Sequence, residues 1–501
     1  MSCNGSVDLV LVNPSSRKKV YQSLGKELSA IEPPVWAGLM ATFVRNHGYR
    51  VAIVDAEAEE LTAAQTADRV LSLKPQLTAV VVYGHQPSAS TQIMPAAGAV
   101  TSILKDRAPD HKVLLVGGHV AALPEQTLRE EAADFVSGGE GLHTMVELLE
   151  ALKTANPDFT QVRDLGYREN GELRFTAPAP LVTDVDQKMP GIAWDLLPME
   201  RYRAHNWHCL GHLERSPYAA VYTTLGCPYK CSFCCIQAPF KSGEAALGLK
   251  VTSNSYRFWS PKRVADDLEM LRQKYGVRNV KFADEMFVLN RRHVEGICDE
   301  LIARRLDLNI WAYARVDTVK EGMLDKLRSA GFTWLAFGIE AANPRVRADV
   351  QKGFDQDDIF RTLSQVRAAG IHVIGNYIFG LPEDDLETMQ QTLDLALEVN
   401  CEFANFYCAM AYPGSPLYRE AVAKGWPLPK TWNGYSQHAV DSLPLPTRYL
   451  SAAQVLRFRD AAFQTYYTNP SYLEMVERTF GWPTVEHIRE MTGHKLERKY
   501  G

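Results

Sequence analysis

Short apolar runs alternate with segments of helical length through about the first 150 residues of the chain. Each run is apolar at nearly every position, which is typical of parallel strands buried on both faces. The alternation predicts a doubly wound α/β domain over residues 1–152, with its ligand beyond the carboxyl ends of the strands. The runs are VDLVLVN (7–13), RVAIVD (50–55), AVVVYG (79–84), KVLLVGG (112–118) and ADFVSGG (133–139).

The pattern changes between residues 153 and 215. Here YRENGELRF (167–175) is typical of a small hairpin with Asn170 and Gly171 at its turn, and proline-rich segments such as APAPLV follow it. We expect this stretch to be a linker between two domains.

A second alternation of strands and helices starts at residue 216. Segment 260–276 begins with Ser-Pro and ends with Gly, as helices often do. Six β/α units predict a partial (β/α)6 barrel of the TIM-like kind over residues 216–425, with its active site at the carboxyl ends of the strands. Residues 426–501 have the composition of a helical C-terminal region. The strand candidates are YAAVYTTLG (218–226), NVKFADE (279–285), NIWAYARV (309–316), WLAFGIEA (334–341), HVIGNYIFG (372–380) and FANFYCAMAYPG (403–414).

Composition and charge restrict the classes of function. The 501-residue chain is 46% hydrophobic and 23% charged, as ordinary globular proteins are. Its net charge of −5 argues against nucleic-acid binding, which favours basic domains. The chain begins without a secretory signal pattern and has no apolar stretch of bilayer length, so we expect a cytoplasmic protein with no transmembrane segment.

Four of the nine cysteines fall within LGCPYKCSFCC (225–235). Cys227, Cys231 and Cys234 have the spacing CxxxCxxC and follow the first predicted barrel strand. A four-cysteine zinc site would need a second CxxC pair, which the other, scattered cysteines do not supply. A disulfide is disfavoured in a reducing cytoplasm. Three thiolates on one loop can instead hold three irons of a [4Fe–4S] cluster and leave the fourth iron open.

With this motif after the first barrel strand, residues 216–425 resemble the radical S-adenosylmethionine (SAM) superfamily. The resemblance implies that the three cysteines bind the cluster, whose open iron chelates the amino and carboxylate groups of SAM. An electron donor such as flavodoxin or ferredoxin would reduce the cluster, and SAM would be cleaved to methionine and a 5′-deoxyadenosyl radical. We interpret Cys235 and Cys408 as buried free cysteines; the alternative for Cys408 is the wall of the substrate cavity.

The same resemblance assigns SAM contacts at four further places. Phe233 resembles the aromatic residue that packs on adenine, and Asp284 and Glu285 resemble the acidic element that receives the SAM amino group. Arg315 would pair with the SAM carboxylate. Glu340 resembles the group near the ribose. Ordinary turns and ion pairs are the alternatives at these positions.

GNYIFGLPEDD (375–385) resembles the glycine-bearing strand region that follows in the family. Its glycines would let the backbone approach SAM closely, although a simple turn explains them as well.

Glycine-rich segments follow three strands of the N-terminal domain. They lie where a large flat cofactor could contact backbone without interference from Cβ atoms. The NAD fingerprint GxGxxG is absent after the first strand, which argues against a dinucleotide fold. The candidate cofactor contacts are Gly84, Gly117, Gly118, Gly138, Gly139, Glu140 and Gly141.

Joined to a radical SAM barrel, this domain resembles the cobalamin-binding radical SAM class. The cobalamin signature DxHxxG would place Asn13 at the aspartate and Ser15 at the histidine. We therefore expect base-off cobalamin without a histidine ligand. His85 and His119 are better interpreted as pocket or surface residues. A flavodoxin-like domain with FMN, or with no cofactor, is the alternative.

The resemblance implies a cobalamin-dependent C-methyltransferase that acts on an unactivated carbon of a small molecule, for example a sugar, lipid, tetrapyrrole or natural-product intermediate. A non-methylating enzyme, such as the anaerobic Mg-protoporphyrin monomethyl ester cyclase or a ring-contracting type, is the second possibility. A sensing protein without turnover is the third. In-facing aromatic residues on the barrel strands would line the substrate cavity or form core: Trp311, Tyr313, Tyr377, Phe406 and Tyr407.

Overall fold

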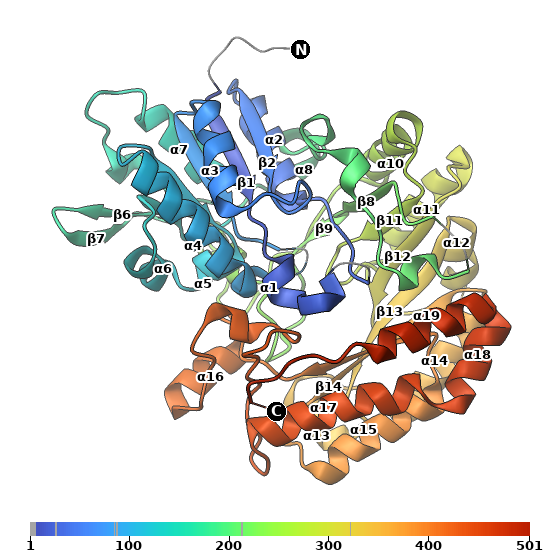
Figure 1. Cartoon of the computed structure of the whole chain (residues 1–501). Helices are drawn as coiled ribbons and strands as arrows, with labels where there is room; N and C mark the ends of the chain where they lie inside the picture. The colour runs from blue at the N-terminus through green and yellow to red at the C-terminus, as the bar shows by residue number, and fades with distance from the viewer. Residues whose placement is uncertain are drawn as a thin grey trace.

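The computed structural model describes residues 7–25, 28–84, 86, 89–211, 214–320 and 322–500. Figure 1 shows an N-terminal α/β domain (blue and cyan) beside a barrel domain (green to orange), with the C-terminal helices (red) packed along the barrel. No helix in these ranges combines the length and apolar composition needed to cross a bilayer.

The N-terminal domain is built on a seven-stranded sheet of order β2-β1-β3-β4-β5-β6-β7. Its first five strands are parallel. Helices α2 (Val35–Asn46) and α7 (Leu142–Ala151) cover one face, and α3 (Ala63–Ser72) and α4 (Ala89–Arg107) cover the other. From β1 the chain adds β2 on one side and then β3, β4 and β5 on the other, so a crevice opens at the carboxyl ends of β1 and β3. The parallel strands are β1 (Leu9–Asn13), β2 (Val51–Asp55), β3 (Leu77–Val81), β4 (Val113–Val116) and β5 (Phe135–Ser137).

The stretch expected to be a linker takes part in both domains. Strands β6 (Leu165–Glu169) and β7 (Glu172–Phe175) form the predicted hairpin, which extends the N-terminal sheet in antiparallel fashion. Further on, the Trp207 ring packs edge-on against Trp311 and Trp334 inside the barrel. Unpaired sheet edges and open barrel ends must be covered, and this segment covers one of each.

The barrel is a six-stranded parallel sheet of order β15-β14-β13-β12-β11-β8. Its two edge strands, β8 and β15, do not pair with each other, so the barrel is partial. Helix α10 (Pro261–Tyr275) begins as expected, because the Ser260 side chain accepts from the Arg263 N–H and Gly276 ends the helix in the left-handed conformation. The strands are β8 (Tyr218–Val221), β11 (Asn279–Phe282), β12 (Asn309–Ala314), β13 (Phe332–Glu340), β14 (His372–Phe379) and β15 (Phe403–Cys408).

Short elements and the outer helices complete the two domains. A two-stranded pair, β9 with β10, follows the first barrel strand. The remaining helices and the β9–β10 pair are α1 (Arg17–Tyr21), α5 (Gly118–Ala122), α6 (Pro124–Glu130), α8 (Val185–Lys188), β9 (Thr224–Leu225), α9 (Lys241–Ala246), β10 (Arg257–Phe258), α11 (Arg291–Arg304), α12 (Met323–Ser329), α13 (Pro344–Asp349), α14 (Gln356–Ala368), α15 (Leu386–Val399) and α16 (Pro416–Lys424). Single 3-10 turns are η1 (Gln22–Gly25), η2 (Phe159–Gln161), η3 (Trp194–Leu196), η4 (Met199–Arg201), η5 (Trp207–Cys209), η6 (Ala238–Phe240) and η7 (Trp432–Tyr435).

Helices α17 (Ala452–Tyr467), α18 (Pro470–Phe480) and α19 (Trp482–Gly493) form the predicted helical region. Helix α17 packs on edge strand β15, where the Tyr467 hydroxyl accepts from the Ala404 N–H at 3.0 Å and donates to the Ala404 carbonyl at 2.7 Å. The doubly wound domain, partial barrel and helical C-terminal region predicted from the sequence are thus confirmed.

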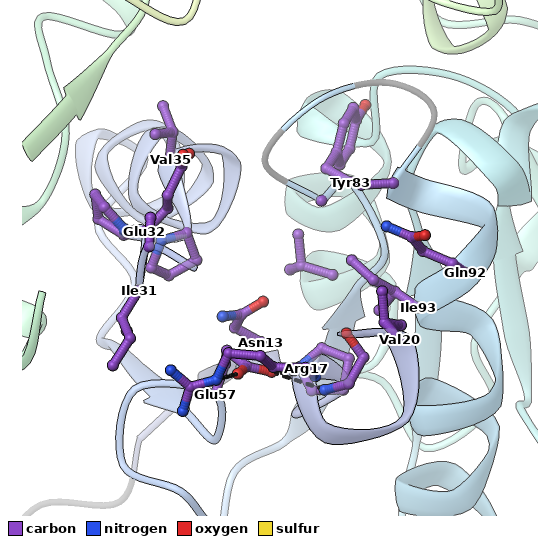
Figure 2. A pocket seen from close by; sticks show the side chains of 18 of the residues that line it. Asn13, Arg17, Val20, Ile31, Glu32, Val35, Glu57, Tyr83, Gln92 and Ile93 are labelled. Carbon is purple, nitrogen blue, oxygen red and sulfur yellow. Dashed lines mark hydrogen bonds and ion pairs between the residues drawn. The ribbon is translucent and has the colours of Figure 1, made fainter. Parts of the chain in front are cut away.

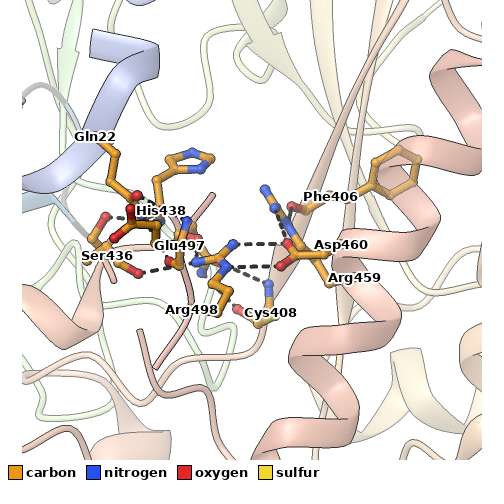
Figure 3. Close-up of polar contacts among 11 residues, drawn as sticks. Gln22, Phe406, Cys408, Ser436, His438, Arg459, Asp460, Glu497 and Arg498 are labelled. Atoms are coloured by element: carbon orange, nitrogen blue, oxygen red, sulfur yellow. Dashed lines mark hydrogen bonds and ion pairs between the residues drawn. The ribbon is translucent and has the colours of Figure 1, made fainter. Parts of the chain in front are cut away.

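Two C-terminal segments tie α1 and η1 to the barrel (Figure 3). The Gln22 amide donates to the carbonyls of His438 at 2.5 Å and Glu497 at 3.2 Å. Arg498 pairs with both carboxylate oxygens of Asp460 on α17, at 2.9 and 3.0 Å. Residues 436–440 and 497–499 together form what we call the C-terminal strap, and it connects the N-terminal domain with the end of β15.

Candidate functional site

The carboxyl edges of the two sheets meet at the domain interface, which buried ion pairs hold together. The Glu140 carboxylate accepts from Arg257 on β10 at 2.6 Å. The Glu32 carboxylate accepts from Lys281 on β11 at 2.9 Å. All four side chains are almost fully buried, so these two ion pairs fix the contact between the domains.

The CxxxCxxC loop follows β8 and β9 at this interface. Its carbonyl groups are held from outside the loop, because the Gln237 and Asn254 side-chain amides both donate to the Cys227 carbonyl, at 2.7 and 3.0 Å. Asn254 also donates to the Tyr229 carbonyl at 2.7 Å. The loop conformation is therefore set by hydrogen bonds that do not use the thiols.

The three motif cysteines differ in exposure but share a desolvated setting. Cys227 is buried, whereas Cys231 and Cys234 are partly exposed. Burial raises the pKa of Cys227 to about 12 and raises those of Cys231 and Cys234 as well. Thiolates here need a compensating cation, as a metal centre provides. In the described ranges, no three His, Cys, Asp or Glu side chains converge as ligands of one ion. A cluster places its thiolates on separate irons, so it fits this donor set better than a zinc ion does.

Asp284 has a different environment from the one expected for a SAM contact. It is fully buried, and its carboxylate accepts from the Thr223 N–H at 2.8 Å, from the Thr224 hydroxyl at 2.7 Å and from the Thr224 N–H. The carboxylate thus holds the segment that leads into the cysteine loop. We infer an indirect, positioning role for Asp284.

Glu285 next to it is the available carboxylate. None of the described residues donates a hydrogen bond to it, and burial raises its pKa to about 8, partly offset by Lys281. The side chain is only partly covered although it lies deep in the protein, so it faces an internal space. A ligand ammonium group there would stabilise the charged form.

Arg315 at the end of β12 lies against the cysteine loop. Its guanidinium stands 4.0 Å from the centre of the Tyr229 ring, which lies between Cys227 and Cys231. Two of its nitrogens pair with Asp317 at 2.9 and 3.0 Å, while the buried Nη1 has no hydrogen-bond partner in the described part of the chain. One guanidinium nitrogen, Nη1, is therefore left to donate to a ligand. A bidentate pair through two nitrogens was expected.

Glu340 at the end of β13 pairs with Lys352, and both side chains are buried. Their charges act on the Cys231 thiol in opposite directions, which places the pair beside the cysteine loop. Phe233 packs against the small apolar cluster that includes Ala341 and Ala409, beyond the ends of β13 and β15. Phe233 and Glu340 are thus near the loop, although Glu340 already has a partner.

The glycines of segment 375–385 are explained by protein contacts. A Cβ atom on Gly375 would lie 2.7 Å from the Tyr377 ring, and one on Gly380 would lie 2.4 Å from Val455. The Asp384 carboxylate accepts from the Gly380 N–H at 3.0 Å and closes the turn. Residues 375–379 are the end of β14, and the turn that follows is closed by its own carboxylate.

A cleft of about 790 Å³, its open mouth included, lies at the β1–β3 crevice. Figure 2 shows Arg17 and Glu57 at one end of the cleft and Tyr83 at the other. Arg17 pairs with Glu57 at 3.0 Å, and its buried Nη1 has no hydrogen-bond partner among the described residues. Asn13 lines the cleft but is bound to Asp55 at 2.7 Å. The orphaned guanidinium nitrogen marks a place for an anionic or carbonyl group.

A second cavity of about 400 Å³, its open mouth included, lies between the N-terminal domain and the cysteine loop. Gly118 and His119 line one side, and Cys235 lines the other. The stacked rings of Trp36 and Tyr83, with centres 4.1 Å apart, line both spaces, so the cavity and the cleft adjoin. Cys235 therefore faces the domain interface.

The candidate glycines fall into two groups. Gly84 lines the cleft and Gly118 lines the second cavity. The others line neither space: a Cβ on Gly117 would lie 2.1 Å from the Val82 carbonyl, and one on Gly139 would lie 2.4 Å from Asp164. A Cβ on Gly84 would also meet protein, 2.8 Å from Ala89. The same holds for Gly138 and Gly141, which face Asp164 and Val116, and Glu140 is bound to Arg257.

Of the two histidines considered in the N-terminal domain, the structure describes one. His119 is buried and shares a hydrogen bond of 3.1 Å with the Thr91 hydroxyl, and burial lowers its pKa to about 3. It is a pocket residue, as expected. His85 lies outside the described residues.

Of the aromatic residues predicted on the barrel strands, Tyr313 and Tyr407 reach the interface, whereas Trp311, Tyr377 and Phe406 are buried in the core. Other residues around the interface, such as Tyr222, were not predicted from the sequence. Tyr222, Tyr313 and Tyr407 keep accessible surface although they lie deep in the protein, where burial raises their pKa values. From the other domain, Tyr21 lies with its ring centre 5.5 Å from that of His438 in the C-terminal strap.

Tyr21 lines the cleft and Tyr222 lines the second cavity, and Tyr407 is near enough to Tyr21 to contribute to its raised pKa. We call the space beside these rings the aromatic chamber. The positions of Tyr21, Tyr222 and His438 in it depend on how the domains pack, so no local motif identifies them.

Comparisons with known proteins agree with this architecture. The family model described as the radical SAM superfamily matches residues 221–396, and the model described as the B12 binding domain matches residues 22–149. The protein thus combines the two domains that define one class of enzyme. It belongs to the cobalamin-binding radical SAM enzymes.

An uncharacterized methyltransferase of Pyrococcus horikoshii is 28% identical to this chain over 93% of both proteins. The anaerobic magnesium-protoporphyrin IX monomethyl ester cyclase of Cereibacter sphaeroides is 28% identical over 82% of this chain and 63% of its own length. Among solved structures, the methyltransferase TsrM of Kitasatospora setae, with cobalamin and a [4Fe–4S] cluster bound, matches with a TM-score of 0.67 at 16% identity. The match covers 93% of this chain and 90% of that one, and it concerns the fold.

Proposed function

We propose that this enzyme is a cobalamin-dependent radical SAM C-methyltransferase that acts on a small molecule. The observation that carries the proposal is the connected space between the sheets: the cleft adjoins the second cavity, and Cys235, which directly follows the cysteine motif, lines that cavity. When bound, a cluster with SAM and a cobalamin would supply the hydrogen-abstracting radical and the transferable methyl group. The protein supplies orientation and exclusion of water.

On the barrel side, Cys227, Cys231 and Cys234 would hold the cluster. Glu285 would receive the ammonium group of SAM, because it is the unpaired carboxylate beside the loop. The free Nη1 of Arg315 would donate to the SAM carboxylate. Phe233 would contact the adenine, and Glu340 would contribute through its pair with Lys352.

On the N-terminal side, the cleft and the second cavity would hold cobalamin. The orphaned Arg17 nitrogen would donate to the phosphate of its nucleotide tail, and Gly84 and Gly118 would let the cofactor approach the backbone. The loop after β1 carries no histidine, and both ring nitrogens of the cleft residue His205 are near protein partners, Ala30 and Glu32. We therefore infer base-off cobalamin without a histidine ligand.

The aromatic chamber would hold the substrate. Tyr407 is near enough to Tyr21 to contribute to the raised pKa of Tyr21, and His438 contributes a buried Nδ1 that has no hydrogen-bond partner in the described ranges. Phenol, imidazole and ring faces suit a neutral molecule with both apolar and hydrogen-bonding groups. We infer a small-molecule substrate of this kind, with no nucleic acid, in a reducing cytoplasm.

Anaerobic turnover of the cobalamin-loaded protein with SAM and candidate substrates tests the proposal. Mass spectrometry should show a product heavier by one CH₂, together with both 5′-deoxyadenosine and S-adenosylhomocysteine. Deoxyadenosine without S-adenosylhomocysteine would contradict methyl transfer. That result would favour the second candidate, a non-methylating cyclase type, which the similarity to the magnesium-protoporphyrin cyclase supports.

A further inference from the structure

An exposed apolar loop lies between α9 and β10. Residues 245–252 are exposed at every position. Leu247 and Leu249 are each 41% exposed, and Val251 is 92% exposed. Three large aliphatic side chains on one short loop are a costly arrangement unless a partner covers them, because such residues are usually packed inside.

The base of the 245–252 loop is bonded to the cysteine loop. Asn254 makes the two hydrogen bonds to the Cys227 and Tyr229 carbonyls described above. The Lys241 ammonium donates to the Ser253 carbonyl at 2.9 Å and to the Asn254 side-chain oxygen at 2.8 Å. A partner seated on this loop would therefore lie next to the backbone that carries the motif cysteines.

The exposed charge within segment 228–252 is of one sign. Lys230, inside the cysteine motif, and Lys241 and Lys250 are all exposed. The single acidic residue of segment 228–252, Glu244, has a side chain that is only 4% exposed and is paired with Lys241. The whole chain has a net charge of −5, so this patch opposes the overall charge.

We propose that the 245–252 loop with Lys230 and Lys250 is the docking surface for the protein that reduces the cluster, a small acidic one-electron carrier with a flavin or iron–sulfur centre. The proposal rests on the proposed function, in which each SAM cleavage consumes one electron at the cluster. The carrier is oxidised by one electron, the cluster is reduced by one, and no atom crosses the interface. An apolar centre with a basic rim complements an acidic partner and steers its approach.

The test compares two reductants on the variant Leu249→Ser/Lys250→Glu/Val251→Ser. The matched control is Lys74→Glu/Ile302→Ser, which alters an exposed lysine and an exposed aliphatic residue away from the cysteine loop. With reduced flavodoxin, the loop variant should lose at least about tenfold in kcat/KM for the carrier, and the loss should shrink at high salt. With titanium(III) citrate, both variants should cleave SAM at the wild-type rate.

Other outcomes overturn the docking surface. Equal loss with both reductants would mean that the loop supports the cluster itself, and unchanged flavodoxin kinetics would place the carrier elsewhere. Wild-type binding to anionic phospholipid vesicles that the loop variant loses, without a change in flavodoxin kinetics, would identify a membrane contact instead. A wild-type protein that cleaves no SAM with titanium(III) citrate would contradict the proposed function, which is a separate failure.

Discussion

The two sheets turn their carboxyl edges toward one space, but their edges are built differently. At the barrel edge, charged side chains are fixed by protein partners: Asp284 by two threonines and Glu340 by Lys352. At the N-terminal edge, the space is bounded by backbone, glycine and stacked rings. A metal cluster needs particular ligand atoms, whereas a large flat cofactor needs a shape. The first requirement leaves a motif in the sequence, and the second leaves little.

The largest expected effect separates the neighbouring cysteines. Cys231→Ala should lose both the cluster and SAM cleavage, because a required thiolate is missing. Cys235→Ala should keep both, because Cys235 faces the second cavity. Iron and sulfide content and deoxyadenosine formation measure the outcome. Equal cluster loss in the two variants would show that our division of the four cysteines is wrong.

The next prediction concerns the fixed charges of the barrel edge. Glu340→Gln should lower the free energy of unfolding by about 3 kcal/mol, because it leaves the buried Lys352 ammonium unpaired. The double variant Glu340→Gln/Lys352→Met should recover part of that loss. Urea denaturation of the three proteins measures both. If Glu340→Gln weakens SAM binding with no loss of stability, Glu340 is a direct SAM contact.

A smaller effect is expected at the shape-defined edge. Gly118→Leu should weaken cobalamin binding about tenfold, because Gly118 lines the second cavity and its added side chain would press on Ser90, which holds the backbone of the cavity residue His119. Iron content should not change. Gly493→Leu, where a Cβ atom meets open space, serves as the control. Unaltered cobalamin affinity in Gly118→Leu, measured by spectrophotometric titration, would move the cofactor away from this cavity.

The smallest effect tests the unpaired carboxylate. Between pH 4.5, the ordinary pKa of a glutamate, and about pH 8, the raised pKa of Glu285, this carboxyl group is protonated in the folded protein. In the unfolded chain it has lost its proton over the same range. Stability from this group is therefore full below the lower value and is lost as pH rises through the window. Relative to wild type, Glu285→Gln should gain more than about 1 kcal/mol across this range. Urea denaturation at the two ends measures the gain, and an unchanged difference would mean that Glu285 is already charged.

The sequence predicted the fold well because buried parallel strands, helix caps and glycine stops are local signals. The role of residues 153–215 was not predicted. Strands β6 and β7 cover an open sheet edge and Trp207 covers an open barrel end, and both of these are formed by other parts of the chain. Local spacing cannot report a partner that is distant in the chain.

The candidate site was predicted unevenly for a related reason. Motif resemblance located Phe233, Glu285, Arg315 and the cysteines near one another, because it marks positions at strand ends. It could not tell that Asp284 is already fully bonded, since its threonine partners precede it by about 60 residues. Tyr313 and Tyr407 were named as possible cavity residues because they lie on barrel strands, but Tyr21 and His438 come from opposite parts of the chain and no local pattern identified them.

The C-terminal strap has a consequence for the order of assembly. Gln22 precedes every strand of both sheets except β1, yet its partner Glu497 follows all of them. The barrel and the N-terminal domain can therefore fold during translation while this side of the chamber is still open. A bulky cofactor delivered in that interval would meet an unfinished wall, and the strap would then enclose it.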